Sequence, residues 1–274
     1  MNMHNTWLVF RKDWLEIKRN WQVLVPIVIL PLMISVVLPL VISIIPVLAP
    51  SQNSSLDGFE TLIKILPAEI QAKIANMSAE QILIYIMTIY FFSPFFLIIP
   101  VMASSVISSD SFAGEKERKT IEALLATPLS DSELFMGKVL VSFIPAIIIT
   151  IASFAVYSFV VDVSTFSLFG GTLLLPNVEW LIIIFGLSPL LALTSIGLTV
   201  IISSRVKGFR EAQQISVVLL LPILGLVFGQ VSGLVLLGPV ILAVLMGLFG
   251  LVDFLVFWVG VRLFQREEIL SKSV

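Results

Sequence analysis

Residues 22–48 read QVLVPIVILPLMISVVLPLVISIIPVL and contain no charged side chain. A helix needs roughly 20 apolar residues to cross a bilayer core that is about 30 Å thick, so this stretch is long enough for one membrane span. It also exceeds the apolar core of about 7–15 residues that is typical of a cleaved signal peptide. We therefore expect it to remain in the protein as a membrane anchor.

Further apolar stretches of similar length follow along the chain. The last two come from one tract that is too long for a single helix. We divide it at residues that break helices, which are Gly229, Gly233, Gly238 and Pro239. The sequence thus predicts an all-α integral membrane protein with about six transmembrane helices in a single transmembrane domain, residues 1–274. The predicted spans are about 22–48, 82–107, 136–160, 180–202, 215–236 and 240–262.

The composition agrees with this class of protein. Of the 274 residues, 58% are hydrophobic and 12% are charged, whereas soluble domains are about 45–50% apolar and about 25% charged. A soluble fold of this size has too little interior to hide so much apolar surface. Lipid is therefore the solvent that suits this chain.

The distribution of basic residues predicts the topology. Fourteen of the 16 lysine and arginine residues lie in residues 1–21, 108–138 and 203–214 or after residue 261, and only Lys64 and Lys73 lie on the opposite side. Because cytoplasmic loops are enriched in lysine and arginine, we expect both termini in the cytoplasm and the protein in the plasma membrane. Residues 49–81 then form an external loop, and residues 108–135 form a cytoplasmic loop.

Several kinds of chemistry are excluded by the residue types. The chain has no cysteine and one histidine, His4, so it lacks the ligands for a zinc site built on thiolates or imidazoles. We expect no metal site, no bound cofactor and no catalytic residue in this chain. The formal net charge of −2 does not favour a nucleic-acid partner.

The N-terminal segment has the pattern of an amphipathic helix. Trp7, Phe10, Trp14, Ile17 and Trp21 recur at helical spacing and form one stripe, while the basic residues fall elsewhere around the helix. A basic helix with tryptophans on its apolar face is typical of a helix that lies in the membrane interface. Residues 1–21 are therefore predicted to be an interfacial elbow helix, which either anchors the chain only or also contacts a cytoplasmic partner.

The most polar stretch of the chain is Gly114–Pro128, GEKERKTIEALLATP. Its residues favour a helix that stops at Pro128. Ile121, Leu124, Leu125 and Pro128 form a short apolar face, which must be buried against the membrane, this chain or another protein. The alternative is a solvated loop that only preserves the topology.

The same stretch superficially resembles the phosphate-binding loop G-x-x-x-x-G-K-[ST], since Gly114 is followed by Lys119 and Thr120. The second glycine is missing and no buried strand precedes it. The lysine would therefore lack the backbone amides that hold phosphate. We reject an ATP site here and expect ATP hydrolysis in another polypeptide.

The stretch from Gly114 to Pro128, with the SxxELxxGK run that follows, resembles the signature of ABC-2 type transporter permeases. In that family an acidic and basic run leads into T-x-E-x-L-L-x-T-P before the third span. Lys119 stands where the family usually has glycine. The matching residues are Glu115, Glu117, Arg118, Thr120, Glu122, Leu124, Leu125, Thr127, Pro128, Gly137 and Lys138.

The resemblance implies a permease subunit with a coupling helix between spans two and three. In that family this helix docks on a separate ATPase subunit, which binds ATP and magnesium. The glutamates Glu115, Glu117 and Glu122 would pair with basic residues of the ATPase, and Leu124 and Leu125 would fill a groove. The resemblance also implies a dimer with a second permease copy or homologue, and export as the direction of transport.

Asp253 lies inside the last predicted span, nine residues before Arg262. A charge inside a span is costly and often functional, so Asp253 is a possible intramembrane polar site. The alternative reading of the chain is a secondary transporter or channel with Asp253 in an ion pathway. An intramembrane aspartyl enzyme would need a second facing aspartate, and only Asp253 qualifies. The sequence leaves the substrate open between lipid, drug, peptide and ion.

Overall fold

A computed structural model describes residues 2–48, 68–120, 127–206, 208–232 and 237–263, and these residues form helices and no strands. The predicted all-α class is confirmed. Six helical runs in the described residues are long and apolar enough to cross a membrane, which confirms the predicted number of spans. These runs are Trp21–Ile44, Ala79–Glu117, Asp131–Thr165, Val178–Arg205, Phe209–Gln230 and Pro239–Trp258.

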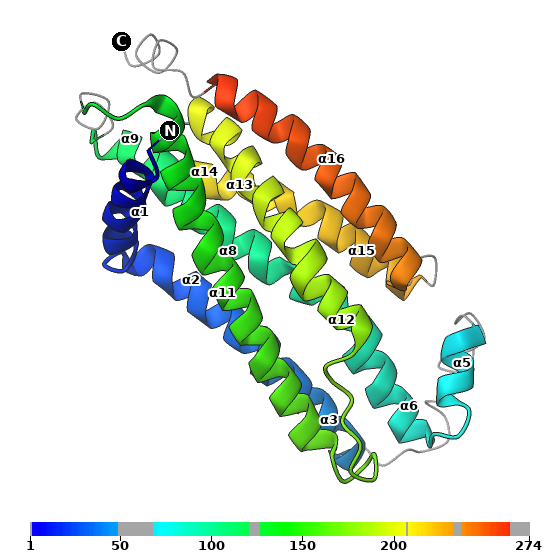
Figure 1. Ribbon diagram of the computed structural model, residues 1–274. Coiled ribbons are helices and arrows are strands. Elements are labelled where there is room, and N and C mark those ends of the chain that lie inside the picture. Colours follow the sequence, from blue (N-terminus) through cyan, green and yellow to red (C-terminus); the bar gives the residue numbers. More distant parts are fainter. Residues whose placement is uncertain (1, 49–67, 121–126, 207, 233–236, 264–274) are drawn as a thin grey trace.

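The runs pack side by side as an elongated bundle, with the first helix lying across one end (Figure 1). The α-helices are α1 (Met3–Ile17), α2 (Trp21–Leu32), α3 (Leu38–Leu48), α5 (Ala68–Ile74), α6 (Ala79–Tyr85), α7 (Ser93–Phe96), α8 (Ile98–Ser109), α9 (Glu115–Glu117), α11 (Asp131–Thr165), α12 (Val178–Ile182), α13 (Ser188–Arg205), α14 (Phe209–Ser216), α15 (Leu221–Val231) and α16 (Pro239–Leu263). Wider π-helical segments, η1 (Met33–Val37), η2 (Ile86–Phe91), η3 (Asp110–Gly114) and η4 (Ile183–Leu187), and the 3₁₀ segment η5 (Val217–Leu220) join some of them.

Three of the π-helical segments have a common cause. Pro39, Pro94 and Pro189 follow η1, η2 and η4 by two or three residues. A proline has no amide hydrogen for the helix, and its ring pushes on the preceding turn. Membrane helices adjust to such prolines by widening locally. The fourth segment, η3, has no proline near it and lies at the site described below.

The end of the bundle away from α1 is held by aromatic packing. The Trp180 ring stacks on Tyr157 at 4.9 Å and on Phe154 at 5.5 Å, and Phe96 meets it edge-on at 5.4 Å. Trp180 Nε1 donates to the carbonyl of Ile89 at 3.0 Å. Because the indole N–H of Trp180 has this partner, the ring can be buried without leaving its donor unpaired. The cluster ties spans two, three and four together.

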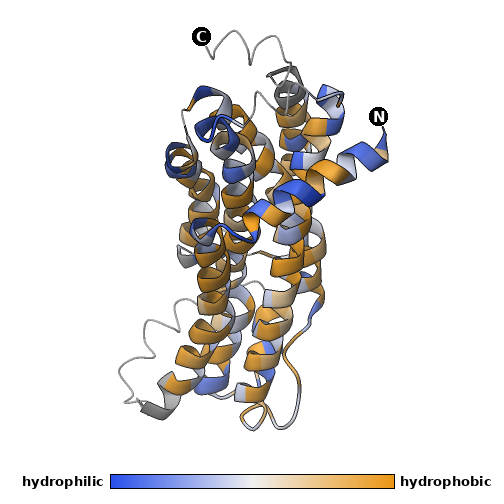
Figure 2. Cartoon of the chain, turned by 90° about the vertical axis from the view of Figure 1, so that its left-hand side faces the viewer, coloured by the Kyte–Doolittle hydropathy of each residue, from blue (hydrophilic) through white to orange (hydrophobic). Residues whose placement is uncertain are grey.

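Hydrophilic residues gather at the opposite end of the bundle, around α1 (Figure 2). The sides of the bundle are hydrophobic over most of their length. Large apolar side chains such as Phe159, Phe185 and Phe228 are exposed there, as expected of a lipid-facing surface.

The helix α1 exists as predicted, but its aromatic residues do not share one environment. Phe10 and Ile17 are buried against the bundle, Trp14 is half-buried, and Trp7 and Trp21 are exposed. The prediction of a single membrane-facing stripe is therefore wrong for Phe10 and Ile17. That the helix lies in the membrane interface stays a prediction.

The reason for this rotation of α1 is the surface on which it packs. Its buried face is centred on Val9 and Asp13 and lies on α11. Gly137 of α11 allows the close approach, because a Cβ atom there would lie 2.7 Å from the Cβ of Val9. Two contacts decide which side of α1 is buried: its close approach to Gly137 and the ion pairing of Asp13. The spacing of apolar residues in the sequence reveals neither contact.

The segment 108–135 was predicted to be a loop, and much of it is helical. The second span continues through η3 and α9 to Glu117, and α11 already begins at Asp131. Ser130 caps α11, and Glu133 completes the capping box. The boundary prediction failed because residues 108–115 are buried among other helices, so their polarity does not mark the end of the helix.

The helix α9 ends at Glu117, and Lys119 has a φ of 57°, so the helix predicted to run to Pro128 is interrupted at residues 118–120. The coupling helix beyond this turn stays a prediction. Residues 121–126 lie outside the described residues. The left-handed conformation costs a residue with a side chain roughly 1–2 kcal/mol, but it costs glycine little. Lys119 therefore stands where glycine would be favoured.

Replacing Lys119 with glycine is expected to stabilise the protein by about 0.5–1 kcal/mol, because relief of strain exceeds the added freedom of the unfolded chain. Thermal unfolding of the purified protein measures the change. The control is Lys18→Gly, which lies at the end of α1 with a φ of −60° and should lose stability. An unchanged or lower stability of Lys119→Gly would mean that the turn is not strained.

Candidate functional site: a buried ion network

Three charged side chains from distant parts of the chain meet beneath α1. Asp13 of α1 is 2% exposed, and Glu115 of α9 and Lys138 of α11 are each 1% exposed. Lys138 Nζ lies 2.5 Å from Glu115 Oε2 and 3.3 Å from Asp13 Oδ2. A lysine this deeply buried is stable only when it is paired and hydrogen-bonded.

The remaining polar atoms around Lys138 supply those hydrogen bonds. Lys138 Nζ donates to the carbonyl oxygen of Ser111, and Ser111 Oγ donates to Asp13 Oδ2 at 2.6 Å. On the outer side, Lys12 Nζ lies 3.1 Å from Asp13 Oδ1 and also pairs with Glu115 Oε1. The two carboxylates thus alternate with two ammonium groups.

A second group of charges extends the network along α1. Asp110, which is also buried, accepts from Arg118 Nη1 and from Asn20 Nδ2, each at 3.0 Å. Arg118 Nη2 also lies 3.5 Å from Glu16 Oε2. Arg118 follows α9 directly, so it fastens the start of the 118–130 connection to the last turns of span two and to α1.

Neighbouring charges shift the pKa values of Asp13 and Lys12. Burial opposes ionisation of Asp13, but Lys138, Lys12 and the Ser111 hydrogen bond outweigh it and hold the pKa of that carboxyl below its usual value. Burial likewise opposes the charge on Lys12, but Asp13 and Glu115 outweigh it and raise its pKa. Asp13 and Lys12 are therefore both charged at neutral pH.

A pH profile tests this assignment. A lowered pKa means that Asp13 stabilises the fold fully above the unfolded-state pKa, about 3.9, and that this is lost as the pH falls through the folded pKa. The raised pKa of Lys12 gives stabilisation below about pH 10.4 that is lost only as the pH rises through its folded value. These two groups should therefore contribute a constant stability between about pH 5 and 9.

The measurement is the thermal unfolding temperature of wild type and Asp13→Asn from pH 3 to pH 9. We expect the variant to be less stable at pH 7 and to lose less stability on acidification. A difference between the two proteins that does not shrink toward pH 3 would contradict the ion pairing of Asp13.

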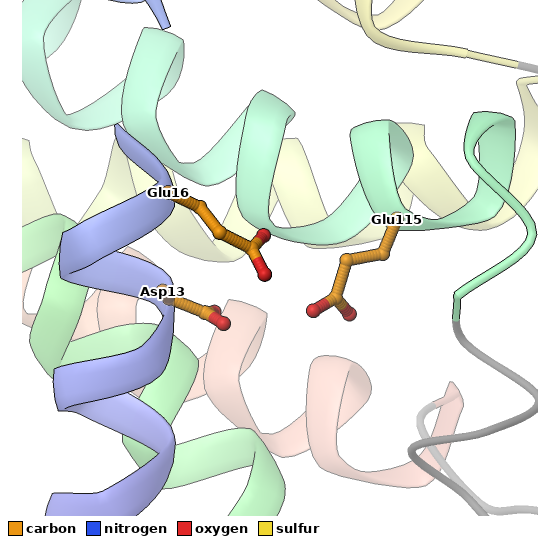
Figure 3. Close-up of side chains that lie close together, drawn as sticks. All are labelled: Asp13, Glu16 and Glu115. Atoms are coloured by element: carbon orange, nitrogen blue, oxygen red, sulfur yellow. The ribbon is translucent and has the colours of Figure 1, made fainter. Parts of the chain in front are cut away.

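The carboxylates of Asp13, Glu16 and Glu115 converge, with ligand atoms within 4.8 Å of one another (Figure 3). This arrangement resembles a cation site in its acidic groups only. Lys12 Nζ lies 3.4 Å from Glu16 and pairs with the other two carboxylates, and Lys138 pairs with Asp13 and Glu115. The ammonium groups supply the positive charge that a metal ion would bring, so the group acts as a structural connection.

The end of span two is also bonded to the start of the fifth span. Lys116 Nζ donates to the carbonyl of Val206 at 3.0 Å, and the amide of Phe209 donates to Glu117 Oε2 at 2.8 Å. Gly208 permits this contact, because a Cβ atom there would lie 2.5 Å from Glu117 Oε2. The short helix α9 thus contacts α1, α11 and the link between α13 and α14.

The structure changes the interpretation of the residues predicted to contact a partner. The prediction that Glu115 pairs with a basic residue of a partner is wrong, because its carboxylate is buried between Lys12 and Lys138. Glu117 and Arg118 are exposed but are bonded within the chain.

The other predicted contact residues lie beyond this network. Thr120 and Pro128 are exposed, and Thr127 is half-buried. Glu122, Leu124 and Leu125 lie outside the described residues, and their role stays a prediction.

The sequence interpretation missed Lys12, Asp13, Asp110 and Ser111. A signal for one of them exists: Thr6, Val9, Asp13 and Ile17 share a helical face. A single acidic residue on an otherwise apolar face indicates a buried partner of opposite charge. The sequence does not identify that partner as Lys138, which matched the motif without a role.

Asp253 lies apart from this network, between α16 and α13. It is 7% exposed, and Thr194 Oγ1 lies 2.5 Å from its Oδ1 atom. Its Oδ2 atom has no hydrogen-bond partner among the described residues. The side chain of Asp253 is buried in the protein interior. Its function as a polar site within the membrane stays a prediction.

A bundle with six membrane-spanning runs and an N-terminal helix locked to the polar end defines a multi-pass membrane protein. The family model of the ABC-2 family transporter proteins matches residues 7–255, nearly the whole chain, and the protein belongs to that family. No curated protein matches the chain. The resemblance predicted from Gly114–Lys138 is thereby confirmed, and the chain is a membrane component of an ABC transporter.

Proposed function

We propose that this chain is the permease subunit of an exporter in the plasma membrane, driven by ATP hydrolysis on a separate ATPase subunit. Family membership supports the ABC transporter class, and the sequence has no complete phosphate-binding loop. The observation that carries the coupling is the ion network, because it joins the 118–130 connection to several helices at once. Both termini face the cytoplasm in this proposal, and two permease chains enclose the pathway.

The network supports a route by which a displacement of the 118–130 connection is transmitted to the transmembrane helices. A rigid contact transmits displacement when its groups are buried and fully paired, since each alternative position would leave a charge unpaired. Glu115 connects α9 to Lys138 on α11 and to Lys12 on α1, while Glu117 connects it to α14. An ATPase that moves the 118–130 connection therefore moves spans two, three and five together.

The surface available to the ATPase differs from the one expected from sequence. With Glu115 buried, the proposed contacts are the exposed Lys119, Thr120 and Pro128, with Leu124 and Leu125 as the apolar anchors. A pair of leucines that fills a groove on the partner is the kind of contact that dominates binding energy.

The test is purification of the tagged protein from its own host in mild detergent, followed by mass spectrometry. We expect an ATPase with a complete phosphate-binding loop in equal amount. The double change Leu124→Asp and Leu125→Asp should weaken its binding on the order of 30-fold without lowering thermal stability. Leu173→Asp, an exposed leucine between α11 and α12, is the matched control and should retain the ATPase.

Retention of the ATPase by the double variant would reject these leucines as the docking contact. A chain that purifies alone in several detergents would reject the separate ATPase and would favour a secondary transporter or channel.

A further inference from the structure

The seam between α13 and α16 contains a carboxylate for which the described residues supply no counter-charge. Asp253 has one hydrogen-bond partner, Thr194, and its Oδ2 atom is buried without any partner in the described part of the chain. At about 1.5 Å per residue, it lies about 21 Å along α16 from Pro239 and about 15 Å from Leu263. It therefore sits within the apolar core, where an unpaired charge is most costly.

The basic residues of these two helices lie more than two helical turns away from Asp253 and Thr194 along the chain. Arg205 at the end of α13 is eleven residues, about 16 Å, from Thr194, and Arg262 is nine residues, about 14 Å, from Asp253. The helix of Lys138 also approaches α16, since Phe135 contacts Phe257. Lys138 itself is paired with Asp13 and Glu115. The segment η4, which also packs on α16, has no ionisable residue.

We propose that Asp253 and Thr194 form a binding site for the cationic group of a lipophilic organic cation. A small metal ion is a poor occupant, because sodium-like and divalent ions need several oxygen ligands and the site offers one carboxylate and one hydroxyl. An organic cation carries its charge on carbon-rich groups and enters lipid without a tight hydration shell. The apolar side chains of Val256 and Phe257, which meet Gly197 about one turn along the same seam, suit such groups.

The position of α16 gives such a ligand a route from the lipid. This helix lies at the edge of the bundle and packs mainly along α13 (Figure 1). Its outer face exposes Phe254, Leu255 and Trp258. The seam itself is closed, because Val256 fits against Gly197 so tightly that a Cβ atom at Gly197 would lie 2.4 Å from its Cγ1. Binding therefore requires α16 to move away from α13.

This inference rests on the proposed function, since it assigns the substrate class of a transport pathway. Its test does not require the ATPase. The full-length chain is reconstituted alone in lipid nanodiscs, and binding of radiolabelled tetraphenylphosphonium is measured against empty nanodiscs. Tetraphenylborate, which has the same shape and the opposite charge, is the ligand control.

We expect saturable binding of tetraphenylphosphonium and none of tetraphenylborate. Asp253→Asn should weaken binding of the cation roughly tenfold or more, because a buried charge pair is lost. Glu179→Gln, which removes the same charge from the first turn of α12, should bind as wild type does. Thr194→Val, which keeps the size of the side chain, should weaken binding about threefold to tenfold and serves if Asp253→Asn does not fold.

The proposal is overturned if binding is not saturable, if both ions bind equally, or if the folded Asp253 and Thr194 variants bind as wild type does. None of these outcomes depends on whether an ATPase accompanies the chain. A failure here with a stoichiometric ATPase in the purified complex would leave the transporter function intact and remove only the substrate class.

Discussion

Replacing Lys138 with methionine is expected to lower the free energy of unfolding by about 3–5 kcal/mol, because it leaves buried carboxylates without their shared counter-charge. Asp13 and Glu115 lie 3.3 Å and 2.5 Å from Lys138 Nζ, and only Lys12 would remain to neutralise them. Methionine keeps most of the volume of lysine, so loss of packing contributes little.

Thermal unfolding of the purified variant measures this effect, and urea titration in mild detergent provides a second estimate. Arg11→Met is the matched control, because it removes the same charge from an exposed position on α1 and should change stability by less than about 0.5 kcal/mol. If the two variants were equally stable, Lys138 would not be the centre of the network.

The second large effect is expected from Gly137→Leu. The Cβ atom alone would lie 2.7 Å from Val9 Cβ and 3.0 Å from the carbonyl oxygen of Thr6, and backbone cannot yield as a flexible side chain can. Overpacking of this kind typically costs about 1–3 kcal/mol. We expect α1 to leave its position on α11 while the transmembrane bundle remains folded.

A cysteine introduced at Val9 reports this movement directly, since the chain has no cysteine of its own. Val9 is buried, so the thiol should react slowly with a maleimide in the parent protein and rapidly when Gly137→Leu is added. Gly247→Leu is the control, because a Cβ atom there has open space. Equal protection of the thiol in both variants would show that α1 does not depend on the glycine.

The class of fold could be predicted from the sequence because lipid imposes simple rules on length and polarity. A run such as 22–48 has one stable environment, and the bias of lysine and arginine predicts which ends share a side. The same rules failed at residues 108–117. Those residues are polar and look like a loop, yet they extend the helix, because their partners come from α1 and α11 and not from water.

The candidate site was less predictable, since periodicity identifies a face but not its partner. The motif drew attention to Glu115 and assigned it to another protein, whereas the structure pairs it with Lys12 and Lys138. A glutamate in a charged run looks the same in sequence whether it is solvated or buried. Asp253 stands out in the sequence because a charged residue within an apolar run has no ordinary surface role. The structure buries its side chain, and its role as an intramembrane polar site stays a prediction.

The long separation between Asp13 and Lys138 has a consequence for biosynthesis. The two residues are 125 positions apart in the chain. At about 5–20 residues per second, roughly 6–25 seconds pass on the ribosome between the synthesis of the aspartate and that of the lysine. During that interval the first span can enter the membrane while the helix before it has no place to dock. The helix α1 is therefore made well before the surface on which it docks, and the third span must be in place before α1 reaches its final position.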